Sequence, residues 1–170
     1  MKIVNMSNSA TPDICFQTEN NQRFRMRAAA IIIENNEILF ATNPIEKYYY
    51  SIGGAIELGE SAEEAVVREV IEETGMHYEV DRLAFIHENF FSRDDGMFKD
   101  IKVHEVTFYF LMKPRGTQKL NSKSITHGVE EKMCWLPINK LSEYEAYPKF
   151  FAEKLKNLKP HPEHIVTIQK

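Results

Sequence analysis

The sequence predicts a single α+β domain, an α/β/α sandwich in which a mixed β-sheet lies between helices. Apolar and β-branched runs of strand length dominate the middle of the chain, and helical segments are few. No internal repeat, low-complexity tract or Pro/Gly/Ser-rich linker divides the 170 residues. A chain of this length buries one sizeable core, so we expect one domain over residues 1–170.

Two hairpins are predicted near the N-terminus. The runs 13–17 and 24–33 lie on either side of the polar stretch TENNQR, which indicates the first hairpin. Asn35 and Asn36 then interrupt two apolar runs, 28–33 and 38–41. Because asparagine tolerates the positive φ of a tight turn, we expect the second hairpin there.

The central strands are predicted from apolar runs and the residues that end them. A short strand over residues 48–50 is expected to end in a loop at Gly53 and Gly54. Residues 78–91 and 103–112 read as two strands around the polar loop SRDDGMFKD. This loop is a candidate substrate lid or dimer contact, although an ordinary surface loop explains it more simply.

The C-terminal part combines one strand with a helical region. Residues 133–136 are apolar and read as a strand. Pro137 and Pro148 punctuate the region that follows, in which residues 149–158 are the best candidate for a helix.

The clearest helix is predicted over Ala62–Thr74. Ser61 followed three residues later by Glu64 fits a capping box, in which each residue satisfies a backbone N–H of the other. Gly75 stands where a helix ends in a left-handed residue. Both ends of this helix are therefore specified by local sequence.

A helical wheel separates two kinds of residue on this helix. Glu69, Glu72 and Glu73 stand at i, i+3 and i+4, so they share an arc of about 100°. Arg68 can neutralise and orient neighbouring carboxylates. The opposite side carries Val66, Val67, Val70, Ile71 and Thr74.

The glutamate face has an ordinary interpretation and a functional one. A solvated face with ion pairs is the usual role of such a cluster. Here Gly53, Gly54 and Gly59 precede the helix and allow the backbone to approach an anion closely. Carboxylates beside such a glycine-rich segment favour a hard divalent cation, Mg²⁺ first and Mn²⁺ as the alternative.

Residues 54–76 resemble the Nudix box of the Nudix hydrolases, written G-x5-E-x7-R-E-U-x-E-E-x-G-U with U a bulky apolar residue. Every specified position is filled, by Gly54, Glu60, Arg68, Glu69, Val70, Glu72, Glu73, Gly75 and Met76. The WLPI stretch at 135–138 is also similar to the family. Ile52 stands where many members have a proline before the first glycine.

The resemblance implies a pyrophosphohydrolase that cleaves a nucleoside diphosphate linked to another moiety, such as a nucleotide sugar, ADP-ribose, a dinucleotide or a modified nucleoside triphosphate. It implies that Glu69, Glu72 and Glu73 are metal ligands and that Glu69 helps to activate water. The backbone carbonyl of Gly53 is a further candidate ligand. Glu60 and Arg68 are expected to form a supporting pair that fixes the carboxylates.

Candidates outside the helix have weaker support. Many family members draw an extra acidic ligand or base from a later loop, and here Glu130 or Glu131 could serve, with Glu105 as a rival. The usual role of such residues is that of a solvated loop charge or of a half-exposed charge at a strand end. The candidate substrate contacts are Arg25, Arg27, Gly54, Glu57 and Glu131. Aromatic residues near the expected cleft are Tyr48, Tyr50, Phe90, Phe91 and Phe98.

Composition restricts the partners of the chain. A formal net charge of −4 and a pI near 5.9 give no general attraction to nucleic acid or anionic membrane. The longest apolar run, residues 28–33, is too short to span a bilayer, and residues 1–9 do not resemble a signal peptide. Two cysteines cannot form a disulfide framework. We therefore expect a cytoplasmic protein with a small nucleotide-derived substrate and no membrane partner.

Three functions remain open from the sequence. The first is the metal-dependent hydrolase. The second is a catalytically silent nucleotide-binding regulatory module on the same fold, although relatives of that kind usually lose box carboxylates and none is missing here. The third is an RNA 5′ pyrophosphohydrolase, which requires a basic track, and residues 113–124 are the only basic stretch. The exact substrate and a homodimeric state are left open.

Overall fold

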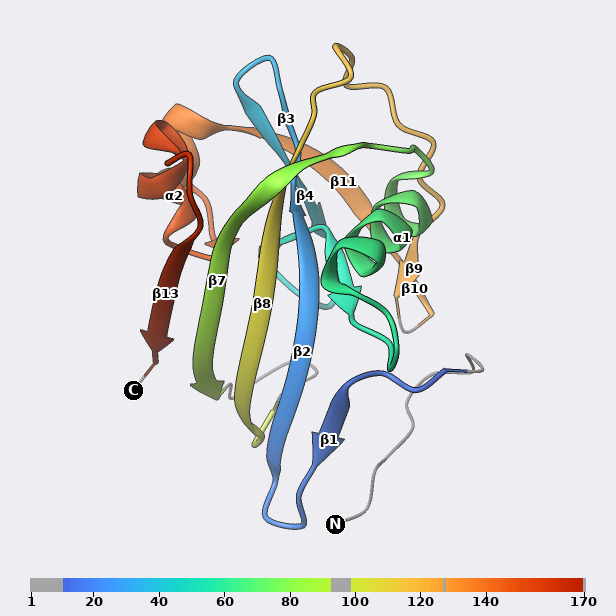
Figure 1. Cartoon of the computed structure of the whole chain (residues 1–170), viewed down its shortest axis with the longest axis vertical. Coiled ribbons are helices and arrows are strands. Elements are labelled where there is room, and N and C mark those ends of the chain that lie inside the picture. The colour runs from blue at the N-terminus through green and yellow to red at the C-terminus, as the bar shows by residue number, and fades with distance from the viewer. Residues whose placement is uncertain (1–10, 93–98, 127, 170) are drawn as a thin grey trace.

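The computed structural model describes residues 11–92, 99–126 and 128–169. Its main element is a mixed sheet of six strands in the order β1-β2-β8-β7-β13, with β6 also paired to β2 (Figure 1). The β2/β8 and β7/β13 pairs are parallel, and the others are antiparallel. The strands are β1 (Cys15–Gln17), β2 (Gln22–Ile31), β6 (Gly53–Ala55), β7 (Val80–Ser92), β8 (Lys102–Met112) and β13 (Glu163–Ile168).

A second sheet has the order β11-β4-β5-β12, with β3 paired to β4, and β9 and β10 form a separate two-stranded ladder. Asn35 and Asn36 have φ values of 53° and 64°, as the predicted hairpin turn between β3 and β4 requires. These strands are β3 (Ile33–Glu34), β4 (Glu37–Thr42), β5 (Tyr49–Ser51), β9 (Ile125–Thr126), β10 (Val129–Glu130), β11 (Lys132–Pro137) and β12 (Ala146–Tyr147).

Helices cover both faces of the main sheet, which confirms the predicted α/β/α sandwich. Because successive strand residues point to opposite faces, Ala28 and Ala30 of β2 join the core beneath helix α1 (Ala62–Thr74). Ala29 and Ile31 join the other core, which includes Phe151 of the short helix α2 (Phe151–Lys154). Two 3₁₀ helices, η2 (Ile138–Glu143) and η3 (Leu155–Asn157), lie on either side of α2 in the chain.

Helix α1 begins and ends where the sequence predicts. The Ser61 hydroxyl accepts a hydrogen bond from the backbone N–H of Glu64 at 3.2 Å, and the Glu64 carboxylate accepts one from the Ser61 N–H at 2.9 Å. Gly75 is left-handed with φ 69°, and its N–H donates to the Ile71 carbonyl. Ile71 itself is 43% exposed, so the expected apolar side is buried only at Val66, Val70 and Thr74.

The expected loop at Gly53 and Gly54 is wrong, because these residues form strand β6. Gly53 pairs with Ala29 and Gly54 with Ala28, so the segment continues along the edge of β2 beyond β1. Glycine has low strand propensity, and this pairing depends on a distant strand that a local pattern does not reveal.

The expected helix over residues 149–158 is only partly present. It is divided into α2 and η3, and the chain then forms β13, which was not predicted. β13 runs parallel to β7 at the outer edge of the main sheet (Figure 1). The run of β-branched residues at 165–168 is a strand signal that could have revealed it. Among the described residues, no helix is long and apolar enough to cross a membrane.

Gly75→Ala should destabilise the fold more than Gly116→Ala. Both glycines have positive φ, 69° and 75°, so alanine introduces backbone strain of about 1–2 kcal/mol at either position. A Cβ on Gly75 would also lie 2.2 Å from the Asn121 carbonyl oxygen, whereas at Gly116 nothing lies within 4 Å. Overpacking of this kind adds about 1–3 kcal/mol. Urea unfolding measures the difference, and equal losses would contradict this account of the helix end.

Candidate active site

Two glycines at the edge of the main sheet allow α1 to approach it closely. A Cβ on Gly53, whose φ is 136°, would lie 2.3 Å from the Ala28 carbonyl oxygen. A Cβ on Gly54 would lie 2.4 Å from Oε1 of Glu69. The Glu69 carboxylate therefore rests directly on the backbone of β6, in space that any side chain at position 54 would fill.

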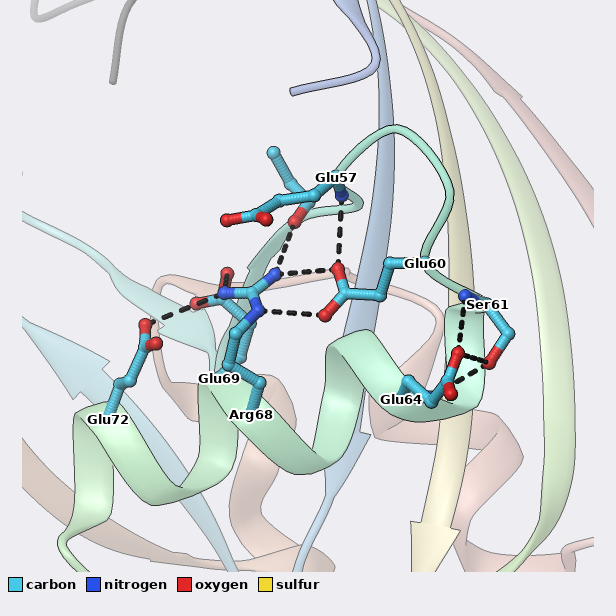
Figure 2. A network of polar contacts seen from close by, with 8 residues as sticks. Glu57, Glu60, Ser61, Glu64, Arg68, Glu69 and Glu72 are labelled. Carbon is cyan, nitrogen blue, oxygen red and sulfur yellow. Dashed lines mark hydrogen bonds and ion pairs between the residues drawn. The ribbon is translucent and has the colours of Figure 1, made fainter. Parts of the chain in front are cut away.

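Arg68 organises the carboxylates on this side of α1 (Figure 2). Its Nε and Nη2 donate to the two carboxylate oxygens of Glu60 at 2.8 and 2.9 Å, a two-pronged pairing that fixes the guanidinium. Nη1 donates to Glu69 at 2.7 Å and lies 3.5 Å from Glu72, and Nη2 also donates to the Ala55 carbonyl at 3.1 Å. The contact between Glu60 and Arg68 that the sequence suggests is thus present, and it holds Glu69 in place.

Glu73 places an unpaired oxygen in the interior. Its Oε1 accepts a hydrogen bond from the Gly53 N–H at 3.3 Å, whereas Oε2 is buried without a hydrogen-bond partner among the described residues. Burial, followed by the charges of Glu131 and Glu69, raises the pKa of Glu73 well above its ordinary value. An unsatisfied buried polar atom costs about 1–3 kcal/mol. The site is therefore built with a free oxygen donor.

Burial also raises the pKa of Glu69, although the Arg68 guanidinium acts in the opposite direction. Glu69 and Glu73 are thus two neighbouring carboxylates in an environment that opposes their joint ionisation. A bound cation relieves this repulsion.

Glu131 is the acidic residue outside the box that joins this group. It is buried, and it accepts hydrogen bonds from the hydroxyls of Tyr50 and Ser124, which hold the carboxylate in one position. Its charge acts on Glu73, so the two carboxylates are close in the interior. Glu130, the alternative candidate, is exposed. Of the two, Glu131 is the one that lines the cleft.

Two partly buried arginines of β2 and the buried Glu105 of β8 form an ion-pair group beside the carboxylates. Glu105 contacts Arg25, and its carboxylate lies 3.9 Å from Arg27 Nη1. Although burial raises the pKa of Glu105, Arg25 and Arg27 bring it below its ordinary value. Nη2 of Arg27 donates to the Gly53 carbonyl at 2.6 Å, so this carbonyl, a candidate metal ligand, already accepts a hydrogen bond. Glu105 acts here as the counterion of the arginines.

These groups surround one cleft with a volume of about 420 Å³. Its floor is the face of the main sheet that also packs against α2, and the second sheet and the segment before α2 form its walls. The predicted residues on its lining are Arg25, Arg27, Gly53, Gly54, Glu69, Glu73, Glu105 and Glu131, together with the aromatic candidates Tyr48, Tyr50 and Phe91.

The other predicted residues that the structure describes lie outside the lining of the cleft, Phe90 and the exposed Glu130 among them. Glu60 and Arg68 support Glu69 from outside, and Glu57 donates its N–H to Glu60 at 3.1 Å. The side chain of Glu72 is 58% exposed and meets Arg68 on the outer side. Its role as a ligand stays a prediction, as do the roles of the other site residues. Phe98 and the loop residues 93–98 lie outside the described residues.

Sequence reasoning missed the far end of the cleft. His87 and Asn89 of β7 and Thr167 of β13 line it, together with aromatic residues of the β12–α2 segment, Tyr147 and Phe150. The alternation of His87, Asn89 and Phe91 in one strand could have revealed a shared face. These residues lie near the Nudix box only because of the order of the strands in the sheet. A local sequence pattern does not reveal that order.

The donor set of this cleft fits a divalent cation. Within residues 11–92, 99–126 and 128–169, no three Asp, Glu, His or Cys side chains are already gathered around one metal position. Nη1 of Arg68 instead stands between Glu69 and Glu72. The buried Glu73 Oε2 and the oxygen-only donors nevertheless match the preference of Mg²⁺ and Mn²⁺. Glu69 and Glu73 would hold such an ion, with Glu131 as the donor from outside the box.

Comparison with known proteins identifies the family of the chain. The sequence pattern of the NUDIX domain matches residues 24–158, so the chain belongs to the NUDIX family. This match also confirms the predicted enzyme class, a Nudix pyrophosphohydrolase. A MutT-like protein of Streptomyces ambofaciens is 29% identical over 136 residues, which are 78% of each chain.

The fold is similar to solved MutT structures. The MutT protein of Bacillus halodurans superposes with a TM-score of 0.62 and 19% identity, covering 85% of this chain and 90% of that one. The MutT protein of Methanosarcina mazei has a TM-score of 0.59 and 19% identity, covering 82% and 94%. At 19% identity, the similarity to these two structures establishes the fold of the chain.

Gly54→Ala should lower turnover by about 10- to 100-fold without unfolding the protein. The backbone of Gly54 does not have positive φ, so alanine is tolerated there, but its methyl group would displace the Glu69 carboxylate, and a shift of about 1 Å can have this effect. Gly116→Ala, far from the cleft in sequence and with open space around it, is the control.

A double-mutant cycle makes this test specific. Because both changes act through one carboxylate, the combined loss in Gly54→Ala/Glu69→Asp should be smaller than the sum of the single losses in free energy. Steady-state kinetics of the four proteins measures the coupling. Additive losses would show that Gly54 acts independently of Glu69.

Proposed function

We propose that the chain is a Mg²⁺-dependent hydrolase that cleaves the diphosphate linkage of a nucleoside diphosphate derivative, with Mn²⁺ as an alternative ion. The observation that carries the proposal is the buried, unpartnered oxygen of Glu73, next to Glu69 and Glu131 in a cleft whose floor carries arginines. The candidate substrates are nucleotide sugars, ADP-ribose, dinucleotides and modified nucleoside triphosphates. The complete set of box carboxylates favours this enzyme over a silent nucleotide-binding module.

The reaction is a water attack at phosphorus. The water oxygen forms a bond to one phosphorus, the bond between that phosphorus and the bridging oxygen breaks, and two phosphorylated products leave. A divalent cation, when bound, neutralises phosphoryl charge and makes water a better nucleophile at neutral pH. Glu69 is our choice for the residue that accepts the proton from water, because its carboxylate lies at the cleft and is oriented by Arg68.

Other residues of the chain position the substrate. Arg25 and Arg27 line the floor, where positive charge orients a diphosphate. Tyr50 and Ser124 hold Glu131 in place, as Glu60 holds Arg68. Burial of this group excludes water from the carboxylates and strengthens their interaction with a cation. We also propose that the protein acts in the cytoplasm on a small substrate, and the homodimer remains a proposal.

Glu69→Gln and Glu73→Gln should each lower turnover by at least about 10²-fold while the fold persists. The amide keeps the size of the side chain and removes the charge that a cation needs. Phosphate release from ADP-ribose, a nucleotide sugar, a dinucleotide and an oxidised nucleoside triphosphate, with Mg²⁺ or with a chelator, measures this. Glu63→Gln, at an exposed position of the same helix, is the control. Mg²⁺-dependent activity retained in the double variant would refute the proposal.

Mg²⁺ should stabilise the wild-type protein against heat. At a hundred times its dissociation constant, an ion that binds only the folded state adds about 2.7 kcal/mol, which raises the Tm by about 5–10 °C in a chain of this size. Glu73→Gln should lose most of this shift, and in chelator it should be at least as stable as wild type, because the buried repulsion is gone. Differential scanning fluorimetry measures both effects. An equal Mg²⁺ shift in the variant would place the ion elsewhere.

A further inference from the structure

The far end of the cleft is connected to the arginines by the register of the main sheet. On its floor, Asn89 of β7 lies opposite Glu105 of β8, which in turn lies opposite Arg25 of β2. One row further along, His87 lies opposite Thr107, which lies opposite Arg27. Neighbouring strands are about 4.8 Å apart, so β7 lies about 10 Å from β2. A sugar or nucleoside attached to a phosphate has a comparable length.

Two polar atoms at this end of the cleft have no hydrogen-bond partner within the described part of the chain. His87 is only 3% exposed, its Nε2 lies 2.9 Å from the Thr167 hydroxyl, and its Nδ1 has no hydrogen-bond partner among the described residues. Oδ1 of Asn89 is likewise buried without a partner within the described part of the chain. Buried polar atoms are nearly always hydrogen-bonded, so two such atoms on residues that line one cavity indicate a missing ligand.

We propose that His87 and Asn89 form a subsite for an uncharged moiety of the substrate, one that carries hydrogen-bond donors and acceptors, such as sugar hydroxyls or the edge of a nucleobase. The inference rests on the proposed function, because it places this moiety beyond the diphosphate. Substrate specificity would then depend on two residues that lie outside the Nudix box. It would also depend on β13, which forms part of this end of the cleft.

The charge of the subsite sets the chemistry of its ligand. Burial lowers the pKa of His87 to about 4, although Glu105 acts in the opposite direction, so the imidazole is neutral at pH 7. Asn89 and Thr167 are neutral as well. A phosphate at this end would meet no cation in these three side chains, whereas the arginines of β2 lie two strands away. A hydroxyl group can both donate and accept, so it satisfies Nδ1 in either tautomer of the imidazole.

Aromatic rings close the subsite from above the sheet. Phe150 packs edge-on against His87 with ring centroids 4.9 Å apart, and Tyr147 and Phe150 both line the cleft. These contacts hold the imidazole in one orientation, and Thr167 fixes its Nε2. β13 therefore has a functional role as the strand that positions His87.

His87→Phe and Asn89→Leu should each raise the KM for the best substrate of the panel about tenfold, with kcat within about twofold and the Mg²⁺ requirement retained. Phenylalanine keeps the ring of His87, and leucine has nearly the shape of asparagine, so both replacements remove hydrogen bonds with little change in packing. Glu88→Gln is the matched control, because it lies on the same strand with its side chain on the opposite face. Thermal melting verifies that each variant is folded.

Calorimetric titration tests the subsite without turnover. Ribose 5-phosphate and glucose 1-phosphate probe sugar recognition, AMP, GMP and UMP probe base recognition, and inorganic pyrophosphate with Mg²⁺ probes the metal and arginine end alone. We expect both variants to weaken the binding of either the sugar phosphates or the nucleoside monophosphates about tenfold. Binding of pyrophosphate should be unchanged.

The outcomes separate this inference from the proposed function. Unchanged KM and unchanged binding of every sugar and nucleoside phosphate, in folded variants of an enzyme that still needs Glu73, would overturn the subsite and leave the hydrolase intact. A loss of kcat at constant KM would also overturn it, because it would place these residues in the chemistry. Loss of pyrophosphate binding in either variant would contradict the assignment of the phosphates to the arginines.

Discussion

The structure depends on the contact between the Glu69 carboxylate and the backbone of Gly54. α1 packs on one face of the main sheet through its apolar residues, yet its carboxylates must reach a cleft on the opposite face. They pass over the edge of the sheet at β6, where Gly53 and Gly54 present no side chain. The same edge supplies the Gly53 N–H to Glu73. A short glycine strand therefore decides whether an ordinary amphipathic helix becomes part of a site.

Charge balance explains the arrangement around this edge. Glu69, Glu73 and Glu131 gather negative charge in the interior, and Arg68, which Glu60 holds in place, compensates part of it by donating directly to Glu69. On the floor of the cleft, Glu105 compensates Arg25 and Arg27 in the opposite sense. The charges of each group are only partly balanced within the chain, and both groups face the same cleft. A bound cation would balance the carboxylates, and the phosphates of a substrate would balance the arginines. The net negative charge of the whole chain does not prevent binding of an anionic substrate, because local positive charge in the cleft contacts the phosphates.

The sequence revealed the parts of the fold that local interactions determine. The bounds of α1 follow from Ser61, Glu64 and Gly75, and the turn at Asn35 and Asn36 follows from their tolerance of positive φ. The Glu60–Arg68 pair followed from resemblance to the Nudix box. These features require only neighbours along the chain or a fixed motif spacing, so no knowledge of the sheet was needed.

The remaining features depend on contacts between distant segments. Gly53 and Gly54 form a strand only because β2 offers a free edge, and β13 pairs with β7, a strand that lies 78 residues earlier in the chain. Glu131 could be distinguished from Glu130 only once Tyr50 and Ser124 were seen to hold it. His87 and Asn89 have no motif at all, and their role follows from burial and from the cavity that they face.

A divalent cation is proposed to bind where α1 meets the edge of the sheet. Anomalous diffraction from crystals grown with Mn²⁺ locates such an ion directly. The account predicts an anomalous peak within about 2.0–2.3 Å of carboxylate oxygens of Glu69 and Glu73, inside the cleft. A peak only on the outer side of α1, at Glu64 or Glu72, or no peak at saturating Mn²⁺, would contradict it.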